Sequence, residues 1–147
     1  MTKINVVFDF DGSLATSFVG GLMFRGYTDE LEVKKASHRF QSEQTSLRQY
    51  QEEVFNLSTE SPAEMSTRAA DGASLRPLSS EVCNQVWESG GTVAVASAGL
   101  DFYIQPVLDK ANLSRIKVNS GKITSDTSKL PPFRYDYPSW NDSCEDD

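Results

Sequence analysis

The sequence predicts an α/β fold in which a parallel sheet carries an inserted helical segment. Residues 6–8 and 92–97 are two apolar runs, and each is continuous rather than alternating, which is typical of strands covered on both faces. The sequence between them has helical spacing and is long enough for the crossover that parallel strands require. We therefore expect a parallel sheet whose strands are joined by right-handed crossovers.

Composition and charge narrow the functional classes. The chain of 147 residues is 38% hydrophobic and 24% charged, which is typical of one folded domain and argues against a disordered chain. Its net charge of -7, with no basic cluster beyond Lys34 and Lys35, argues against a nucleic-acid partner. No run has the length of a signal-peptide core or a membrane span, and the two cysteines, Cys83 and Cys144, suggest reduced thiols. We expect a cytoplasmic protein without a membrane partner.

The first strand is expected at residues 6–8, and its continuous apolar character predicts a buried central strand. Asp9 and Asp11 follow directly, at the strand end where parallel sheets bind ligands, and strand alternation places both side chains on one side. Two carboxylates this close repel each other unless a metal ion or a shared proton holds them together, and Mg²⁺ prefers such oxygen ligands. The pattern on its own equally suits a turn that caps a helix.

A helical insertion is expected over residues 13–75. Leu47, Tyr50 and Val54 recur at helical spacing, and the segment 46–49 matches a capping box. The apolar stripe of this helix is expected to pack on the core rather than to bind a partner.

The second half of the chain continues the alternation of helix and strand. An amphipathic helix is expected over residues 78–91, the second strand over 92–97, and another helix over 100–113. This order of elements again favours a parallel α/β sheet.

Two further elements are expected near the end of the chain. Residues 115–126 predict a β-hairpin with its turn at Ser120-Gly121, because short strand-like runs flank this pair. Residues 131–147 are rich in proline, aromatic and acidic side chains without a period, which predicts an extended tail.

These motifs together resemble the haloacid dehalogenase (HAD) superfamily of phosphohydrolases. The family's first motif, Asp-x-Asp-Gly-Thr/Ser after an apolar strand, is matched by "DFDGS" at residues 9–13. Its second motif is a hydrophobic strand that ends in Ser or Thr, and residues 92–97 end in Ser97. The following "SAGLDFYIQPVL" looks like the branch of phosphoserine phosphatase-like and methionine-salvage phosphatases. The resemblance spans residues 4–125 in order, and it implies a Rossmann-like parallel sheet with a helical cap.

The resemblance also implies the chemistry, a Mg²⁺-dependent hydrolysis of a small phosphorylated metabolite through an aspartyl-phosphate intermediate. Asp9 would be the nucleophile and a metal ligand, and Asp11 would be the general acid and base and a second metal ligand through its backbone carbonyl. Ser97 would donate a hydrogen bond to a phosphoryl oxygen. The backbone N–H groups of Ala98 and Gly99, at the start of the next helix, would assist it.

The implied domain organisation follows the same family. Residues 1–12 and 76–130 would form the α/β core, residues 13–75 a helical cap over the site, and residues 131–147 an extended acidic tail. A cap of this kind excludes water and selects the substrate.

The family's third and fourth motifs, a lysine and a late pair of aspartates, are not recognisable in the sequence. Lys122 and Lys129 do not lie at the start of an expected helix, and the acidic residues 145–147 are typical of a solvated chain end. We therefore expect the front part of a HAD phosphatase, with weak Mg²⁺ binding and slow turnover. A truncated, catalytically incompetent HAD-like binding domain is the alternative.

The missing fourth motif has a structural consequence as well. In the resembling fold its strand pairs with the first strand, so without it an apolar sheet edge is left uncovered. We therefore expect self-association through this edge.

Overall fold

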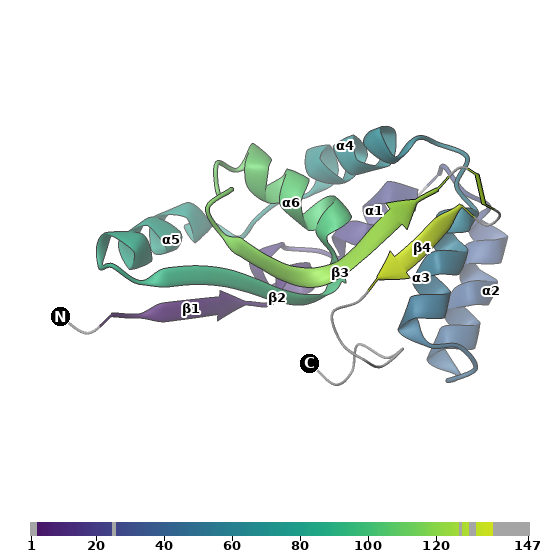
Figure 1. Ribbon diagram of the computed structural model, residues 1–147, viewed down its shortest axis with the longest axis horizontal. Helices are drawn as coiled ribbons and strands as arrows, with labels where there is room; N and C mark the ends of the chain where they lie inside the picture. The colour runs from purple at the N-terminus through teal and green to yellow at the C-terminus, as the bar shows by residue number, and fades with distance from the viewer. Residues whose placement is uncertain (1–2, 25, 127, 130–131, 137–147) are drawn as a thin grey trace.

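A four-stranded sheet in the order β1-β2-β3-β4 forms the base of the molecule (Figure 1). The computed structural model describes residues 3–24, 26–126, 128–129 and 132–136. The first three strands are parallel and the fourth is antiparallel to the third. The expected α/β class with a mostly parallel, Rossmann-like sheet is confirmed.

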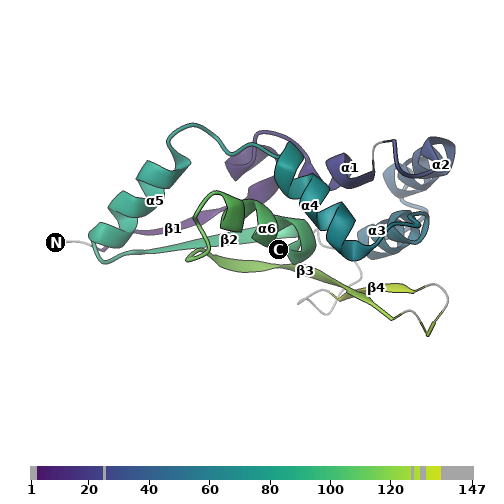
Figure 2. The same cartoon turned by 90° about the horizontal axis from the view of Figure 1, so that it is seen from above.

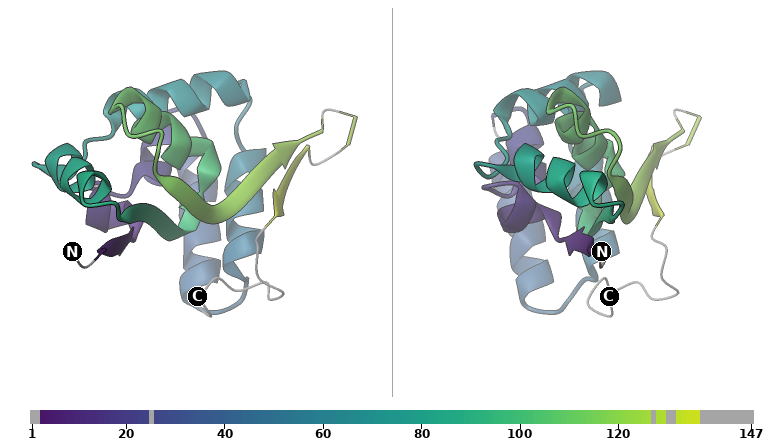
Figure 3. Two further views of the ribbon diagram at one scale, coloured as in Figure 1. Left: turned by 60° about the vertical axis from the view of Figure 1, so that its left-hand side comes forward. Right: turned by 90° about the vertical axis from the view of Figure 1, so that its left-hand side faces the viewer.

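The strands differ in length. Strands β1 (Asn5–Phe8) and β4 (Phe133–Asp136) are short, whereas β2 (Thr92–Leu100) and β3 (Lys117–Ser125) are long. The first half of β3 pairs with β2, and its second half runs beyond β2 and pairs with β4. Figure 3 shows β4 lying along this far half of β3.

Two crossover helices cover one face of the parallel strands. Helix α5 (Ser79–Glu88) precedes β2, helix α6 (Asp101–Lys110) precedes β3, and both lie above the sheet in Figure 1. Right-handed crossovers that step in one direction along a sheet place their helices on the same face. Val93 and Val95 point from β2 into this layer and are buried.

Strand β1 is not the buried central strand that its apolar run predicts. It lies at the edge of the sheet, and its residues alternate between exposed and half-buried. Ile4 is 57% exposed and Val7 is 66% exposed. Val7 pairs in register with Ala94, on the face that α5 and α6 leave uncovered in the described part of the chain. A continuous apolar run predicts two covered faces, and here only one is covered.

Four helices lie beyond the carboxyl ends of β1 and β2 (Figure 2). They are α1 (Val19–Phe24), α2 (Glu30–Gln41), α3 (Leu47–Asn56) and α4 (Pro62–Gly72). The helix expected from the spacing of Leu47, Tyr50 and Val54 is confirmed as α3, and so is its capping box. No described helix is long and apolar enough to cross a membrane.

The helical segment is joined to the sheet at two places. Helix α4 packs along α6, and α3 packs against β4. Phe133 N donates to Asn56 Oδ1 at 3.0 Å, and Tyr135 N donates to Glu52 Oε1 at 2.7 Å. These two hydrogen bonds satisfy backbone donors of β4 with side chains of α3. The division into a core (1–12 and 76–130) and a cap (13–75) remains a prediction.

The hairpin predicted with a turn at Ser120-Gly121 is wrong, because both residues lie inside β3. The hairpin is formed by β3 and β4, so its connection follows Ser125. A Cβ added to Gly121 would lie 2.2 Å from Tyr135 Oη. The glycine therefore serves the close approach of a tyrosine from the next strand rather than a turn.

The prediction of an extended tail over residues 131–147 is wrong for the first part of this segment. Residues 133–136 form β4, in which Phe133 and Tyr135 are buried. The acidic residues 145–147 lie outside the described residues.

Candidate active site

The motif at residues 9–13 forms a tight turn at the carboxyl end of β1. In this turn, η1 (Phe10–Leu14), Ala15 N donates to Phe10 O at 2.9 Å, and Gly12 adopts the left-handed region with φ 72°. Phe10 is fully buried and anchors the turn in the core. Glycine reaches positive φ without the strain that a Cβ brings.

The same turn holds Asp9 at the surface. Phe10 N donates to Asp9 Oδ1 at 2.7 Å, and Ser13 Oγ donates to Asp9 Oδ2 at 3.1 Å. The side chain of Asp9 is exposed. These contacts orient a carboxyl group that solvent and a ligand can reach.

Asp11 is held differently, between α1 and α6. Val19 N, at the start of α1, donates to Asp11 Oδ1 at 2.7 Å, and Tyr103 Oη donates to Asp11 Oδ2 at 2.5 Å. Burial raises the pKa of Asp11 above its ordinary value, the hydrogen bonds from Tyr103 and Val19 lower it, and the charge of Asp9 raises it. The two aspartates therefore differ in environment, which suits one for attack and the other for proton transfer.

Tyr103 is the residue of this site that the sequence does not reveal. From the sequence it is a core residue of the helix over 100–113, and it is indeed only 5% exposed. Burial, and then the negative charge of Asp11, raises the pKa of Tyr103 well above its ordinary value. The tyrosine thus stays protonated and donates to Asp11. No local pattern announces this contact between residues 92 positions apart.

The second motif lies inside β2 rather than at its end. The strand continues through Ser97, Ala98 and Gly99 to Leu100, and its pairing with β3 shifts register between Ala96 and Leu100. Such an irregularity turns side chains and backbone groups away from regular pairing. The carboxyl ends of β1 and β2 lie at the same edge of the sheet because these two strands pair in parallel.

Ser97 and Gly99 contact each other within this irregular stretch. Gly99 N donates to Ser97 Oγ at 3.0 Å, which fixes the serine oxygen and leaves its O–H to donate elsewhere. A Cβ added to Gly99 would lie 2.1 Å from Tyr103 Oη and 2.8 Å from Asp11 Oδ2. Gly99 therefore makes room for the Asp11–Tyr103 hydrogen bond, in addition to any contact with a ligand.

One cavity of about 740 Å³ brings the expected site residues together. Asp9, Asp11, Ser97, Ala98 and Gly99 all line it. The shared crevice expected from the two strand ends is therefore present in the structure. Helices α1, α2 and α3 supply most of the remaining walls, and Tyr103 of α6 also lines the cavity.

The donor set of the cavity fits Mg²⁺. The candidate protein ligands are the Asp9 carboxylate and, as the resemblance implies, the backbone carbonyl of Asp11. The described residues contain no group of three or more His, Cys, Asp or Glu side chains that could hold a metal. Mg²⁺ is usually held by one or two carboxylates and completes its shell with waters and phosphate oxygens. This donor set resembles that arrangement more than a closed, all-protein metal cage.

Neither Lys122 nor Lys129, which the sequence does not favour for the third motif, lines the cavity. Lys122 is exposed on β3. Burial raises the pKa of Asp101 above its ordinary value, and the charge of Lys122 opposes this rise. Lys129 pairs with Asp126 at 3.2 Å. Among the described residues that line the cavity, Lys34 of α2 is the basic one.

Comparison with known proteins supports the fold. No family model and no curated protein sequence matches the chain. Among solved structures, a phospho-aspartyl intermediate analogue of phosphoserine phosphatase is similar, with a TM-score of 0.64, 21% identity and coverage of 91% of this chain and 64% of that chain. A HAD family hydrolase from Salmonella enterica serovar Typhi is similar with a TM-score of 0.67 and 15% identity, and the match covers 92% of this chain and 45% of that chain. Cytosolic 5'-nucleotidase IIIB bound to cytidine is similar with a TM-score of 0.63 and 19% identity, and the match covers 92% of this chain and 54% of that chain.

These likenesses confirm the expected resemblance at the level of the fold. The chain has the fold of HAD hydrolases, phosphoserine phosphatase among them. It spans less than two thirds of the length of these structures, 64%, 45% and 54%.

Proposed function

We propose that this chain carries the nucleophile half of a Mg²⁺-dependent HAD phosphatase that hydrolyses a small phosphorylated metabolite, in the cytoplasm. The observation that carries the proposal is the convergence of Asp9, Asp11 and Ser97 on one cavity at the carboxyl ends of two neighbouring parallel strands. Phosphatases with this fold supply the chemical precedent, since one of them was captured as a phospho-aspartyl intermediate analogue.

In the first step a carboxylate oxygen of Asp9 attacks phosphorus. The new O–P bond forms as the ester P–O bond breaks, and Asp11 gives its proton to the departing alkoxide. In the second step a water gives its proton to Asp11 and attacks the aspartyl phosphate, which releases inorganic phosphate and restores Asp9. The exposed Asp9 suits attack, and the raised pKa of Asp11 suits a group that must carry a proton.

Mg²⁺ would be held by the Asp9 carboxylate and by Asp11, and when bound it would offset the negative charge of the phosphoryl group. Ser97 would donate to a phosphoryl oxygen, with the N–H groups of Ala98 and Gly99 nearby. Tyr103 acts on Asp11 as a positioning residue, because its hydroxyl fixes one carboxylate oxygen. The helices over residues 13–75 would act as the cap that excludes water.

The test is a direct search for the intermediate. Purified protein is mixed with an aryl phosphate and Mg²⁺, quenched in acid, and analysed by mass spectrometry for a phosphoryl group on Asp9. We expect slow turnover, because in the described part of the chain no lysine beside Asp9 and Asp11 offsets the charge, and loss of one such partner typically costs about 10²-fold or more in rate. Asp9→Asn should abolish both the phosphoprotein and the metal-dependent turnover.

Asp109→Asn is the matched control, because Asp109 is an exposed residue on α6 whose carboxylate accepts a hydrogen bond from Gln105 and does not line the cavity. Turnover that survives Asp9→Asn, or that falls equally in Asp109→Asn, would contradict the proposal.

A catalytically incompetent binding domain is the second candidate. It is favoured by the two carboxylates that lack a neighbouring lysine and a third acidic ligand among the described residues. In that case a phosphorylated ligand binds with Mg²⁺, and neither phosphoprotein nor free phosphate forms. The same quench experiment separates the two functions.

A further inference from the structure

The cavity extends far beyond the two carboxylates. Its volume of about 740 Å³ is in the range of pockets that bury ligands of drug size, roughly 300–1,000 Å³. A phosphoryl group at Asp9, Asp11 and Ser97 occupies only one end of it. The rest of the cavity must hold the body of the ligand, so its lining reports the chemistry of that body.

Much of the cavity lining is apolar. The apolar walls come from the segment 18–24 and from α3, through side chains that share a hydrocarbon or aromatic surface: Phe18, Met23, Phe24, Leu47, Val54 and Phe55. Phe24 and Phe55 meet edge to face with their ring centroids 5.1 Å apart. Met23 and Phe55 are buried in the core as well, so this part of the wall is fixed by packing.

Polar side chains also line the cavity, from α2 and the residues just before it. Thr28 precedes this helix, and Glu30 and Lys34 lie on its first turns. Both charged residues are exposed, so they line the part of the cavity that opens to solvent. The lining therefore combines the carboxylates at the strand ends, a large set of apolar side chains, and polar side chains on α2 that are open to solvent.

Resting on the proposed phosphatase function, we propose that the substrate is a phosphate monoester of an apolar alcohol, with an alkyl chain or ring next to the ester oxygen. A methylene chain placed against these walls gains affinity with each group removed from water. The hydroxyl and amino groups of a sugar phosphate or a phosphoamino acid would lie against these mostly apolar side chains and lose hydrogen bonds to water, and among the described lining residues α3 offers polar groups only at Tyr50 and Gln51. The apolar lining thus discriminates against small polar esters.

The test measures binding rather than turnover. The 147-residue protein is titrated with n-alkylphosphonates from ethyl to hexyl in the presence of Mg²⁺, and isothermal titration calorimetry gives the Kd of each. The dependence of Kd on alkyl length measures how much the alkyl group contributes to binding. We expect Kd to fall up to about fourfold for each added methylene, the fold-change that follows from burial of one such group. A Kd that changes less than twofold from ethyl to hexyl overturns the proposal, and so does tighter binding of O-phosphoserine than of hexylphosphonate.

Two variants of exposed apolar residues sharpen the measurement. Phe18, 77% exposed, lines the cavity, whereas Leu31, 61% exposed, lies on α2 outside its lining. Phe18→Ser should weaken hexylphosphonate binding several-fold and leave ethylphosphonate unchanged, and Leu31→Ser should change neither. Equal effects of the two substitutions would overturn the proposed role of the wall.

The outcome separates this inference from the proposed function. A steep dependence on chain length with no hydrolysis of any ester keeps the apolar ligand and overturns the phosphatase. Brisk hydrolysis of O-phosphoserine, with no gain for hexyl phosphate over ethyl phosphate, keeps the phosphatase and overturns the apolar substrate.

Discussion

At the scale of single residues, the site depends on how closely three groups from different elements approach. Asp11 follows β1, Gly99 lies near the end of β2, and Tyr103 lies on α6. The hydrogen bond between Tyr103 Oη and Asp11 Oδ2 is 2.5 Å long, and a Cβ at position 99 would lie too close to both oxygen atoms. The absence of a side chain at Gly99 is therefore a condition for the geometry of Asp11.

Gly99→Ala should destabilise the protein. The added Cβ would lie 2.1 Å from Tyr103 Oη, so the tyrosine must move, and overpacking of this kind costs about 1–3 kcal/mol. Urea unfolding measures the change. Gly21→Ala is the control, because nothing lies within 4 Å of its added Cβ and alanine favours a helix by about 0.5–1 kcal/mol. Equal unfolding midpoints for the two variants would contradict the steric argument.

Asp11→Asn should stabilise the protein at neutral pH. The pKa of Asp11 is raised from its ordinary value of 3.8, so the folded state prefers the protonated carboxyl. The stabilisation of the folded state by the protonated Asp11 carboxyl is fully present when the pH is below the ordinary pKa. It is lost as the pH rises through the raised pKa of the folded state. The asparagine variant does not ionise and keeps its stability.

The melting temperature of both proteins is measured from about pH 4 to about pH 7, a range that covers typical raised pKa values of carboxyl groups. The advantage of the variant should grow as the pH rises. A constant difference across the range would show that the ionisation of Asp11 is not responsible.

Tyr103→Phe should raise the pKa of Asp11 further. The substitution removes a hydrogen bond that lowers this pKa and keeps the ring that buries the carboxyl. Carboxyl-carbon NMR titration reads the value directly. Tyr27→Phe, at a half-exposed tyrosine outside the cavity, should leave the titration unchanged. An unaltered pKa in Tyr103→Phe would mean that the hydroxyl does not position Asp11.

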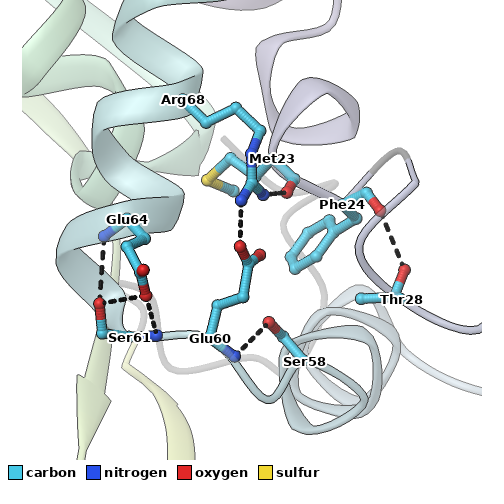
Figure 4. A network of polar contacts seen from close by, with 8 residues as sticks. All are labelled: Met23, Phe24, Thr28, Ser58, Glu60, Ser61, Glu64 and Arg68. Carbon is cyan, nitrogen blue, oxygen red and sulfur yellow. Dashed lines mark hydrogen bonds and ion pairs between the residues drawn. The ribbon is translucent and has the colours of Figure 1, made fainter.

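At the scale of the elements, Arg68 ties α4 to α1, one of the helices that line the cavity (Figure 4). Its guanidinium donates to Met23 O at the end of α1 and pairs with Glu60 before α4. It also lies over the ring of Tyr27, 3.2 Å from the centroid. One planar side chain thus satisfies a carbonyl near the carboxyl end of α1 and holds α1 against α4.

Arg68→Lys should lower the unfolding free energy by about 1–2 kcal/mol, because an ammonium cannot make both directed contacts and the stacking at once. Chemical denaturation checks it. The control is Lys110→Met, which removes a pair with Asp71 whose side chains are 55% and 65% exposed, and such exposed pairs contribute about 0–1 kcal/mol. Similar losses in both variants would show that the geometry of Arg68 adds nothing.

At the scale of the whole molecule, the sheet has one covered face and one open face. Val7, Ala94 and Ala96 lie on the open face, and β1 is the free parallel edge in the described part of the chain. An edge strand with exposed apolar side chains is a template for pairing with another chain. Self-association through β1 thus remains our prediction for the assembly.

Val7→Lys should convert associated protein to monomer, since a charge on this face is costly to bury in an interface. Light scattering after size exclusion at increasing concentration measures the mass. Leu78→Lys is the matched control at another exposed apolar residue, 68% exposed, which lies just before α5. A wild-type protein that stays monomeric at every concentration would refute the prediction.

Much of this architecture was predictable because it depends on neighbours along the chain. The capping box of α3, the helical spacing of Leu47 and Val54, and the turn at residues 9–13 arise from contacts within a few positions. The strand character of β1 and β2 is likewise a local pattern of apolar residues. Parallel pairing of these strands then places Asp9, Asp11 and Ser97 at one edge, so the site could be located before its geometry was known.

Other features required the tertiary structure, because they depend on what lies opposite a residue and not beside it in sequence. Val7 has the sequence context of a buried residue, and it is exposed because the described chain covers only one face of the sheet. Gly121 lies between turn-like neighbours, and it belongs to a strand because Tyr135 packs over it. Tyr103 has the pattern of a core residue, and its hydroxyl meets Asp11 only when α6 folds back over the end of β1. Local sequence specifies backbone conformation through short-range forces, whereas burial and side-chain partners are set by packing between distant segments.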